Sequence, residues 1–190
     1  MLEEATFWLD ETFSWQRARL SWVNLIKLFF ESHSSMVLHY FLLHLWLNLG
    51  ESEWVLRSLS VIFGVASIPA IYILGSKLFG KKAGLVSAVL LALHSFHVQY
   101  SQEARSYSLL FFLIILSSYF FIRAIESPRE TKYWVLYVVS SVLAVYSHPF
   151  AILVLFTHIL SLNRKMIMHI TSPLFLKVIG FLIIFLALVH

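Results

Sequence analysis

The sequence has 190 residues, 59% of them hydrophobic and only 13% charged, and a mean hydropathy of +0.82. This balance excludes an ordinary soluble domain and indicates a chain that lies in lipid. The net charge of +4 comes from Lys and Arg scattered between apolar runs, which argues against a nucleic-acid partner, and the absence of cysteine excludes a disulfide framework or a cysteine nucleophile.

Residues 1–53 predict an outer-face region of interfacial helices. Apolar residues recur at roughly helical spacing over 15–30, and tryptophan favours the headgroup layer, so we expect a helix along the membrane surface. The apolar run 36–49 contains His39, His44 and Asn48. It is shorter than the roughly 20 residues that a spanning helix needs, so we expect it to stay at the interface.

Residues 54–190 predict a transmembrane helical domain with about six crossings. The first apolar run carries Arg57 near its start and Pro69 inside, which such helices tolerate. The expected crossings are 54–78, 83–100, 106–125, 133–147, 150–162 and 174–189. The predicted fold class is therefore all-α: a multi-pass transmembrane helical bundle with an amphipathic interfacial amino-terminal region.

The positive charges of the short loops orient this bundle, because Lys and Arg are retained on the cytoplasmic side. Loops that the crossings place on one side hold Lys77, Lys81, Lys82, Arg123, Arg129, Lys132, Arg164 and Lys165. The intervening turns, 99–105 and 147–149, hold only Arg105. With 36–49 at the interface, the extracytoplasmic face is predicted to carry Asp10, Glu11, Glu103, Arg105 and His148.

The carboxylate pair Asp10-Glu11 is the first candidate for chemistry. Asp10 is the only aspartate, and such a pair near a membrane surface can act as a base or bind a divalent cation. The alternative is a solvated acidic lead-in without a catalytic role.

Glu103 and Arg105 stand between two strongly apolar segments, where ionisable residues are costly and hence usually functional. The alternative is an ion pair that caps helix ends at the headgroups. His148 ends a crossing and can donate to a phosphate, or it is simply an interfacial group. Arg57 either extends to the headgroups or meets an anionic lipid phosphate.

No metal site is predicted from the histidines. His33, His39 and His44 have a spacing that matches no recognised ligand pattern, so we interpret them as interfacial groups.

Five segments, in this order, resemble the lipid-dependent membrane glycosyltransferases of the GT-C fold, the group of protein O-mannosyltransferases and aminoarabinose transferases. They are Leu-Asp-Glu-Thr-Phe-Ser at 9–14, Leu-His-Tyr-Phe-Leu-Leu-His-Leu-Trp at 38–46, Gly-Glu-Ser-Glu-Trp-Val-Leu-Arg-Ser-Leu-Ser at 50–60, Leu-Phe-Gly-Lys-Lys-Ala-Gly at 78–84 and Val-Gln-Tyr-Ser-Gln-Glu-Ala-Arg-Ser-Tyr at 98–107. The likeness extends over about residues 7–159.

The resemblance implies transfer of a mannose-like or other sugar from a polyprenyl-phosphate carrier to a protein, lipid or glycan acceptor on the outer face, with inversion. It implies Asp10 as catalytic base, Glu11 as the neighbour that positions it, and Glu103 as a further acidic group. Arg105 would meet the carrier phosphate, and His148 matches a recurring Tyr-x-His. An Arg suits this role because its planar guanidinium can hold phosphate through two hydrogen bonds.

Two departures from the family pattern concern the ends and the first loop. Only nine residues precede Asp10, where relatives have a transmembrane helix, and relatives continue beyond His190, so we expect a chain truncated at both ends. The common Pro-Pro is replaced near Ser-Ser-Met-Val at 34–37. A non-catalytic membrane subunit or lipid-binding relative is the rival interpretation, and a transporter is a weaker third.

Overall fold

The computed structural model describes residues 9–30 and 36–162, and every regular element in these ranges is a helix. The amino-terminal helices are α1 (Leu9–Ala18), α2 (Trp22–Phe30) and α3 (Val37–Trp46), followed by the 3-10 turn η1 (Leu47–Leu49). The remaining helices are α4 (Glu53–Phe79), α5 (Lys81–Leu93), α6 (Ser95–Ser101), α7 (Tyr107–Glu126), α8 (Thr131–Ser147) and α9 (Ala151–Leu160). The predicted all-α class is confirmed, whereas the expected crossing at 174–189 lies outside the described residues.

Two of these helices, α4 and α7, are long and apolar enough to cross a bilayer. The 27 residues of α4 give it a length of about 40 Å, more than the roughly 30 Å of a hydrocarbon core. Large apolar side chains on α4 are exposed, as lipid contact requires: Val61, Ile62, Val65 and Ile73. The chain is therefore a membrane protein.

The segment 83–100, expected as one crossing, is two helices that meet at a bend of 62°. His94 adopts an extended conformation between α5 and α6, with φ −74° and ψ 116°. Helix α6 then packs on α4, where Gly64 leaves the space that Ser101 fills. Together α5 and α6 make at most one span, so the described residues contain two or three spans by length and apolarity. The total of about six stays a prediction.

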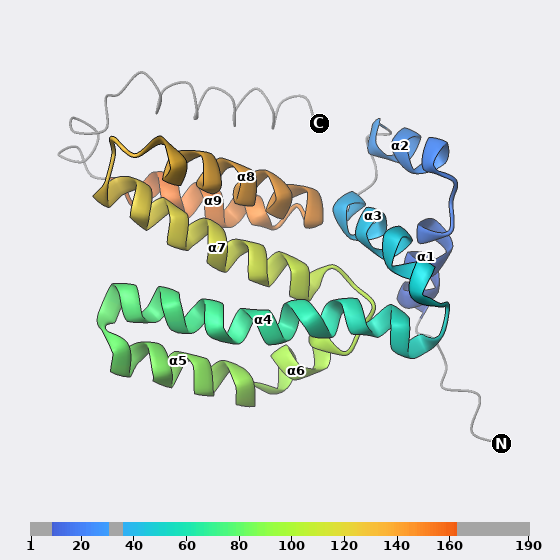
Figure 1. Cartoon of the computed structure of the whole chain (residues 1–190), viewed down its shortest axis with the longest axis horizontal. Coiled ribbons are helices and arrows are strands. Elements are labelled where there is room, and N and C mark those ends of the chain that lie inside the picture. Colours follow the sequence, from blue (N-terminus) through green and yellow to red (C-terminus); the bar gives the residue numbers. More distant parts are fainter. Residues whose placement is uncertain (1–8, 31–35, 163–190) are drawn as a thin grey trace.

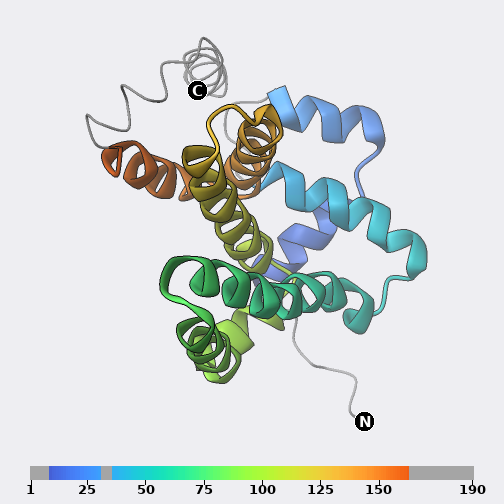
Figure 2. The same ribbon diagram turned by 60° about the vertical axis from the view of Figure 1, so that its left-hand side comes forward.

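Helices α4 and α7 lie side by side and run in the same direction (Figure 1). The Nζ of Lys77, near the end of α4, lies 2.7 Å from a carboxylate oxygen of Glu126, at the end of α7. The first turn of α5, with Lys81 and Lys82, and the loop that carries Arg129 therefore share this end of the bundle. The three amino-terminal helices gather at the opposite end, around the start of α4 (Figures 1 and 2).

Small residues allow α4 and α5 to pack closely. A Cβ added to Gly84 would lie 2.6 Å from the Tyr72 carbonyl oxygen, and one added to Gly75 would lie 3.0 Å from the Gly84 Cα. Such close backbone approach is typical of helices that associate in lipid.

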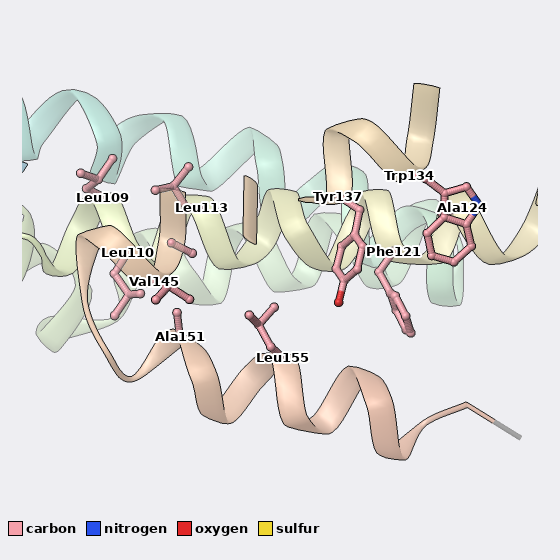
Figure 3. Close-up of a cluster of buried hydrophobic side chains, with 11 residues drawn as sticks. Leu109, Leu110, Leu113, Phe121, Ala124, Trp134, Tyr137, Val145, Ala151 and Leu155 are labelled. Carbon is pink, nitrogen blue, oxygen red and sulfur yellow. The ribbon is translucent and has the colours of Figure 1, made fainter. Parts of the chain in front are cut away.

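The larger apolar core joins α7, α8 and α9 (Figure 3). Trp134 is fully buried there; Tyr137 packs beside it, and Phe121 packs on Tyr137. A second core joins the amino-terminal helices to α4 and to the turn before α7; its buried members are Ala18, Leu43, Leu56, Leu59 and Ala104. This second core positions the site, because it holds α1 and α3 against the turn at 102–106.

Candidate active site

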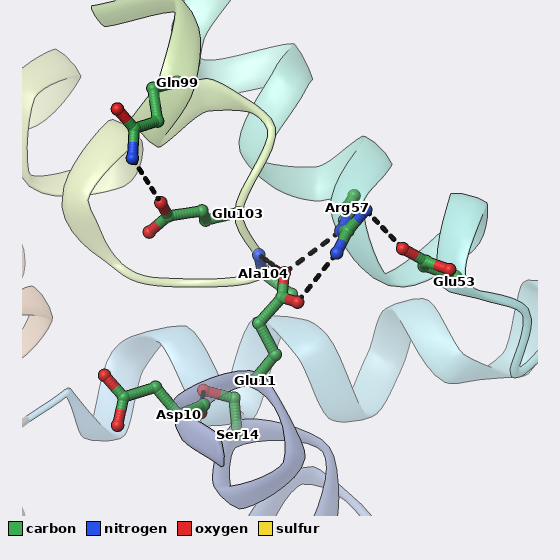
Figure 4. Close-up of polar contacts among 8 residues, drawn as sticks. All are labelled: Asp10, Glu11, Ser14, Glu53, Arg57, Gln99, Glu103 and Ala104. Atoms are coloured by element: carbon green, nitrogen blue, oxygen red, sulfur yellow. Dashed lines mark hydrogen bonds and ion pairs between the residues drawn. The ribbon is translucent and has the colours of Figure 1, made fainter. Parts of the chain in front are cut away.

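Glu11 of α1 is buried and connects three parts of the chain (Figure 4). Its Oε1 accepts a hydrogen bond from the backbone N–H of Ala104 at 2.8 Å. The guanidinium of Arg57 donates to both carboxylate oxygens, from Nε at 3.1 Å and from Nη2 at 2.8 Å. The acidic motif of α1 and the Gln-Glu-Ala-Arg turn at 102–105 therefore meet at one end of the bundle.

Arg57 lies between two carboxylates, since its Nη1 also forms an ion pair with Glu53, one turn earlier on α4. The predicted role for Arg57 was to bind a substrate phosphate. Its guanidinium is already directed at Glu11 and Glu53, and this arrangement fixes α1 on α4.

Asp10 lies beside Arg105. The Oδ2 of Asp10 is 3.1 Å from the Arg105 Nη1; the Asp10 side chain is 68% exposed, whereas that of Arg105 is only 15% exposed. An acceptor can therefore reach the carboxylate, next to a fixed and mostly buried positive charge.

Arg105 keeps hydrogen-bonding capacity beyond this ion pair. Its Nη2 donates to the Tyr107 hydroxyl at 3.4 Å, and its Cζ lies 5.5 Å from the centre of that ring. The Nε of Arg105 is buried and has no partner in the described part of the chain. A guanidinium with a free N–H in such surroundings suits an anionic oxygen.

His148 lies next to the same tyrosine, with its ring 5.8 Å from that of Tyr107. The backbone N–H of Phe150 donates to Nδ1 of His148 at 3.2 Å, so the neutral ring carries its hydrogen on Nε2. Burial, and to a lesser degree the charge of Arg105, lowers the pKa of His148. His148 can thus offer an N–H to a ligand beside Arg105 at neutral pH.

Glu103 is half-buried, and its carboxylate accepts a hydrogen bond from Gln99 at 3.4 Å (Figure 4). It turns away from Asp10 and Glu11 in this view, so the structure does not bring the three predicted acidic residues into contact. Two of the predicted residues, Asp10 and Arg105, do face one another.

Sequence reasoning did not assign roles to Tyr107, Ser60 or His39. Tyr107 contacts both Arg105 and His148, and Ser60 donates to the Arg105 carbonyl oxygen at 3.1 Å. His39, expected at the interface, is instead 1% exposed. All three lie within sequence segments that resemble the glycosyltransferases, and this resemblance was the one signal from which a role for them could have been predicted.

Among residues 9–30 and 36–162, no group of three or more His, Asp or Glu side chains is arranged to hold a metal ion. His33, from the histidine set considered above, lies outside these ranges. Asp10 and Glu11 point in different directions from α1, and Glu11 is directed at Arg57 (Figure 4). Asp10 pairs instead with Arg105. The carboxylate pair therefore does not present both groups to one cation.

A mostly apolar groove of about 390 Å³ begins beside this site. It is formed by α5, α6 and α7 and by His94 between α5 and α6, and the lining residues with polar groups are His94, His97, Tyr100, Tyr107 and Ser108. Tyr107 forms part of the groove and also contacts Arg105, so the groove and the guanidinium are neighbours.

An all-helical bundle with two helices apolar enough to span a bilayer defines an integral membrane protein. At one end it carries an exposed carboxylate, a mostly buried arginine and an adjoining apolar groove. The chain belongs to the dolichyl-phosphate-mannose-protein mannosyltransferase family, whose sequence pattern matches residues 33–190. No curated protein and no solved structure matches the chain. The family match includes Arg57, Arg105 and His148 but begins after Asp10. Membership implies a membrane glycosyltransferase that uses a polyprenyl-phosphate sugar donor.

Proposed function

We propose that this chain transfers a sugar, mannose or a related hexose or pentose, from a polyprenyl-phosphate carrier to a hydroxyl acceptor on the extracytoplasmic face. The observation that carries the proposal is the pairing of the exposed Asp10 carboxylate with the mostly buried Arg105 guanidinium at 3.1 Å. A base for the acceptor and a cation for the leaving group are the two demands of this reaction, and here they are adjacent.

In the proposed reaction, the acceptor oxygen attacks the anomeric carbon from the side opposite the phosphate. The carbon–oxygen bond to the phosphate breaks, and its electron pair leaves with the phosphate oxygen. Asp10 takes the proton of the acceptor hydroxyl. The configuration at the anomeric carbon is inverted, because bond formation and bond breaking occur on opposite faces.

Arg105 and His148 bind the carrier phosphate in this proposal. The unpartnered Nε of Arg105 and the Nε2 hydrogen of His148 supply donors, and the positive charge of Arg105 stabilises the developing anion. Burial strengthens this attraction, because the effective dielectric is lower than in water.

The prenyl chain of the carrier occupies the groove between α5, α6 and α7. Its apolar side chains, such as Leu91, Leu110 and Ile114, match an isoprenoid. Tyr107 lines the groove and also contacts Arg105, so a lipid in the groove can have its polar end next to Arg105. In this proposal Arg57 and Glu11 support the site by fixing α1 on α4. Glu103 belongs to the site through its position on the turn at 102–106 and does not contact Asp10.

The direct test is transfer from a radiolabelled polyprenyl-phosphate mannose in membranes that contain the full chain. Asp10→Asn should abolish transfer while carrier binding persists, because only the base is lost. Glu51→Gln, which neutralises an exposed carboxylate paired with Arg19, is the matched control and should transfer normally. Unchanged transfer by Asp10→Asn would refute the proposal. Carrier binding without turnover in the wild-type chain would instead favour a non-catalytic lipid-binding subunit.

A further inference from the structure

Tyr107 is the first residue of α7, one of the two helices long and apolar enough to cross a bilayer. A residue at the end of a span lies where the hydrocarbon meets the headgroups. Tyrosine favours this layer, because its ring is apolar and its hydroxyl is polar. Tyr107 is therefore at the depth where a protein meets both the phosphate and the first carbons of a lipid.

Tyr107 belongs both to the apolar groove and to the charged end of the site. Its ring lines the groove, and the centre of that ring lies 4.9 Å from the ring of Tyr100, another lining residue. The same ring lies 5.8 Å from that of His148, and the Cζ of Arg105 lies 5.5 Å from its centre. One side chain thus connects the space for a lipid chain with the two groups proposed to bind phosphate.

The guanidinium of Arg105 directs its two terminal nitrogens at different partners. Nη1 pairs with Asp10 at 3.1 Å, and Nη2 donates to the Tyr107 hydroxyl at 3.4 Å. The proposed base and the groove therefore meet different nitrogens of one rigid, planar group. A phosphate at the head of a lipid in the groove would meet the Tyr107 hydroxyl on the nitrogen that Asp10 does not occupy.

The hydroxyl hydrogen of Tyr107 has no acceptor among residues 9–30 and 36–162. A phenol can accept one hydrogen bond and donate another. Since the Tyr107 oxygen accepts from Arg105, its own hydrogen points away from the guanidinium. A bond accepted from a cation also polarises the O–H group and makes it a stronger donor. Such a donor beside a mostly buried arginine suits an anionic oxygen.

We propose that Tyr107 is a binding residue for the carrier: its O–H donates to a phosphate oxygen, while its ring packs against the first isoprene unit in the groove. This inference rests on the function proposed above and adds the group that recognises the junction of phosphate and chain. The alternative is that the hydroxyl only satisfies an N–H of Arg105. Removing the hydroxyl would then free Nη2 for the phosphate, so binding would be unchanged or tighter.

Tyr107→Phe separates these two interpretations, because it removes the hydroxyl and keeps the ring. Native mass spectrometry of the full chain in micelles can measure the affinities for undecaprenyl phosphate and for undecaprenol, which has the same chain without the phosphate. Tyr107→Phe should weaken binding of the phosphate lipid by about 10- to 100-fold, the size expected for a hydrogen bond to a charged group. Its affinity for undecaprenol should be unchanged. Tyr107→Leu should weaken binding of both lipids, because the ring is lost as well.

Tyr40→Phe is the matched control, because Tyr40 makes the same two contacts with another arginine. Its hydroxyl accepts from the Arg17 Nη1 at 3.4 Å, and the Arg17 Cζ lies 5.3 Å from its ring centre. Tyr40 is on α3, away from the groove between α5, α6 and α7, so Tyr40→Phe should bind both lipids as the wild type does.

Three results would overturn the proposal. The first is unchanged or tighter binding of undecaprenyl phosphate by Tyr107→Phe. The second is an equal loss of this binding in Tyr40→Phe, which would show that the effect is not specific to the groove. The third is unchanged binding of undecaprenol by Tyr107→Leu, which would contradict the contact between ring and chain.

Failure of the proposed function gives a different result. A wild-type chain that binds undecaprenyl phosphate without transferring sugar would refute the transferase activity and leave the role of Tyr107 intact. A wild-type chain that binds undecaprenyl phosphate no better than undecaprenol would refute the carrier site as a whole, Tyr107 included. In an active chain, Tyr107→Phe should raise KM for the carrier-linked sugar and leave KM for the acceptor unchanged.

Discussion

The guanidinium of Arg57 donates to both carboxylate oxygens of Glu11, a residue 46 positions away in the sequence. The Glu11 side chain is 1% exposed, whereas that of Arg57 is 31% exposed. The carboxylate of the pair is therefore removed from solvent, and the guanidinium stays partly exposed. A buried carboxylate that loses its partner keeps the cost of desolvation without the compensating attraction.

Arg57→Met should therefore destabilise the protein by about 3–5 kcal/mol, because Glu11 would remain buried without its cation. Replacing both residues, as Arg57→Met with Glu11→Met, should cost less than Arg57→Met alone. Reversible unfolding in mixed micelles measures these differences. Arg19→Met removes the exposed Arg19–Glu51 pair and should change stability by less than about 1 kcal/mol. Equal losses for Arg57→Met and Arg19→Met would contradict this account of the pair.

The contact between α4 and α6 gives a steric prediction. A Cβ at Gly64 would lie 2.2 Å from the Oγ and 2.7 Å from the Cβ of Ser101. Gly64→Ala should therefore destabilise the protein by about 1–3 kcal/mol, the usual cost of overpacking. Ser101→Gly should restore much of the loss in the double variant, as measured by the thermal midpoint in detergent. Val65→Ala, on the exposed face of α4, is the control. A loss that persists in the double variant would mean that Ser101 is not the obstacle.

The pKa of His39 predicts how stability depends on pH. Burial lowers that pKa from 6.5 to about 4, so the unfolded chain binds more protons than the folded one between these values. The contribution of the neutral ring is fully present above pH 6.5 and is lost as the pH falls towards 4. Relative to His39→Asn, the wild-type chain should lose a few kcal/mol across this window. Other histidines titrate in both proteins and cancel in the comparison. Parallel stability curves would show that His39 is not held neutral.

The sequence predicted those parts of the fold that depend on uninterrupted local patterns. The apolar runs that became α4 and α7 are continuous and long, and hydropathy alone identifies them. The break between α5 and α6 was missed, because residues 83–100 contain no Asp, Glu, Lys or Arg and no Pro, and their one Gly, Gly84, lies far from the bend at His94. What places the bend is tertiary: His97 bonds to the Gly64 carbonyl at 3.2 Å, and Ser101 fills the space beside Gly64.

The candidate site was predicted in its residue types but not in their pairing. Asp10 and Arg105 were singled out by charge within an apolar sequence, and the structure brings them together. Glu11 and Arg57 were assigned to chemistry, whereas their mutual contact is a long-range pairing that no local pattern encodes. His39 was expected at the membrane interface, and only the structure shows that it is 1% exposed.

The most direct test of the central claim is the sidedness of the two motifs that form the site. Single cysteines at Gln16 on α1, at Gln102 on the turn and at Lys82 at the opposite end of the bundle can be labelled in intact cells with an impermeant thiol reagent, since all three positions are exposed and the chain contains no cysteine. The account predicts that Gln16→Cys and Gln102→Cys react from outside, while Lys82→Cys reacts only after the membrane is opened. Labelling of Gln16→Cys and Gln102→Cys from opposite sides would contradict it.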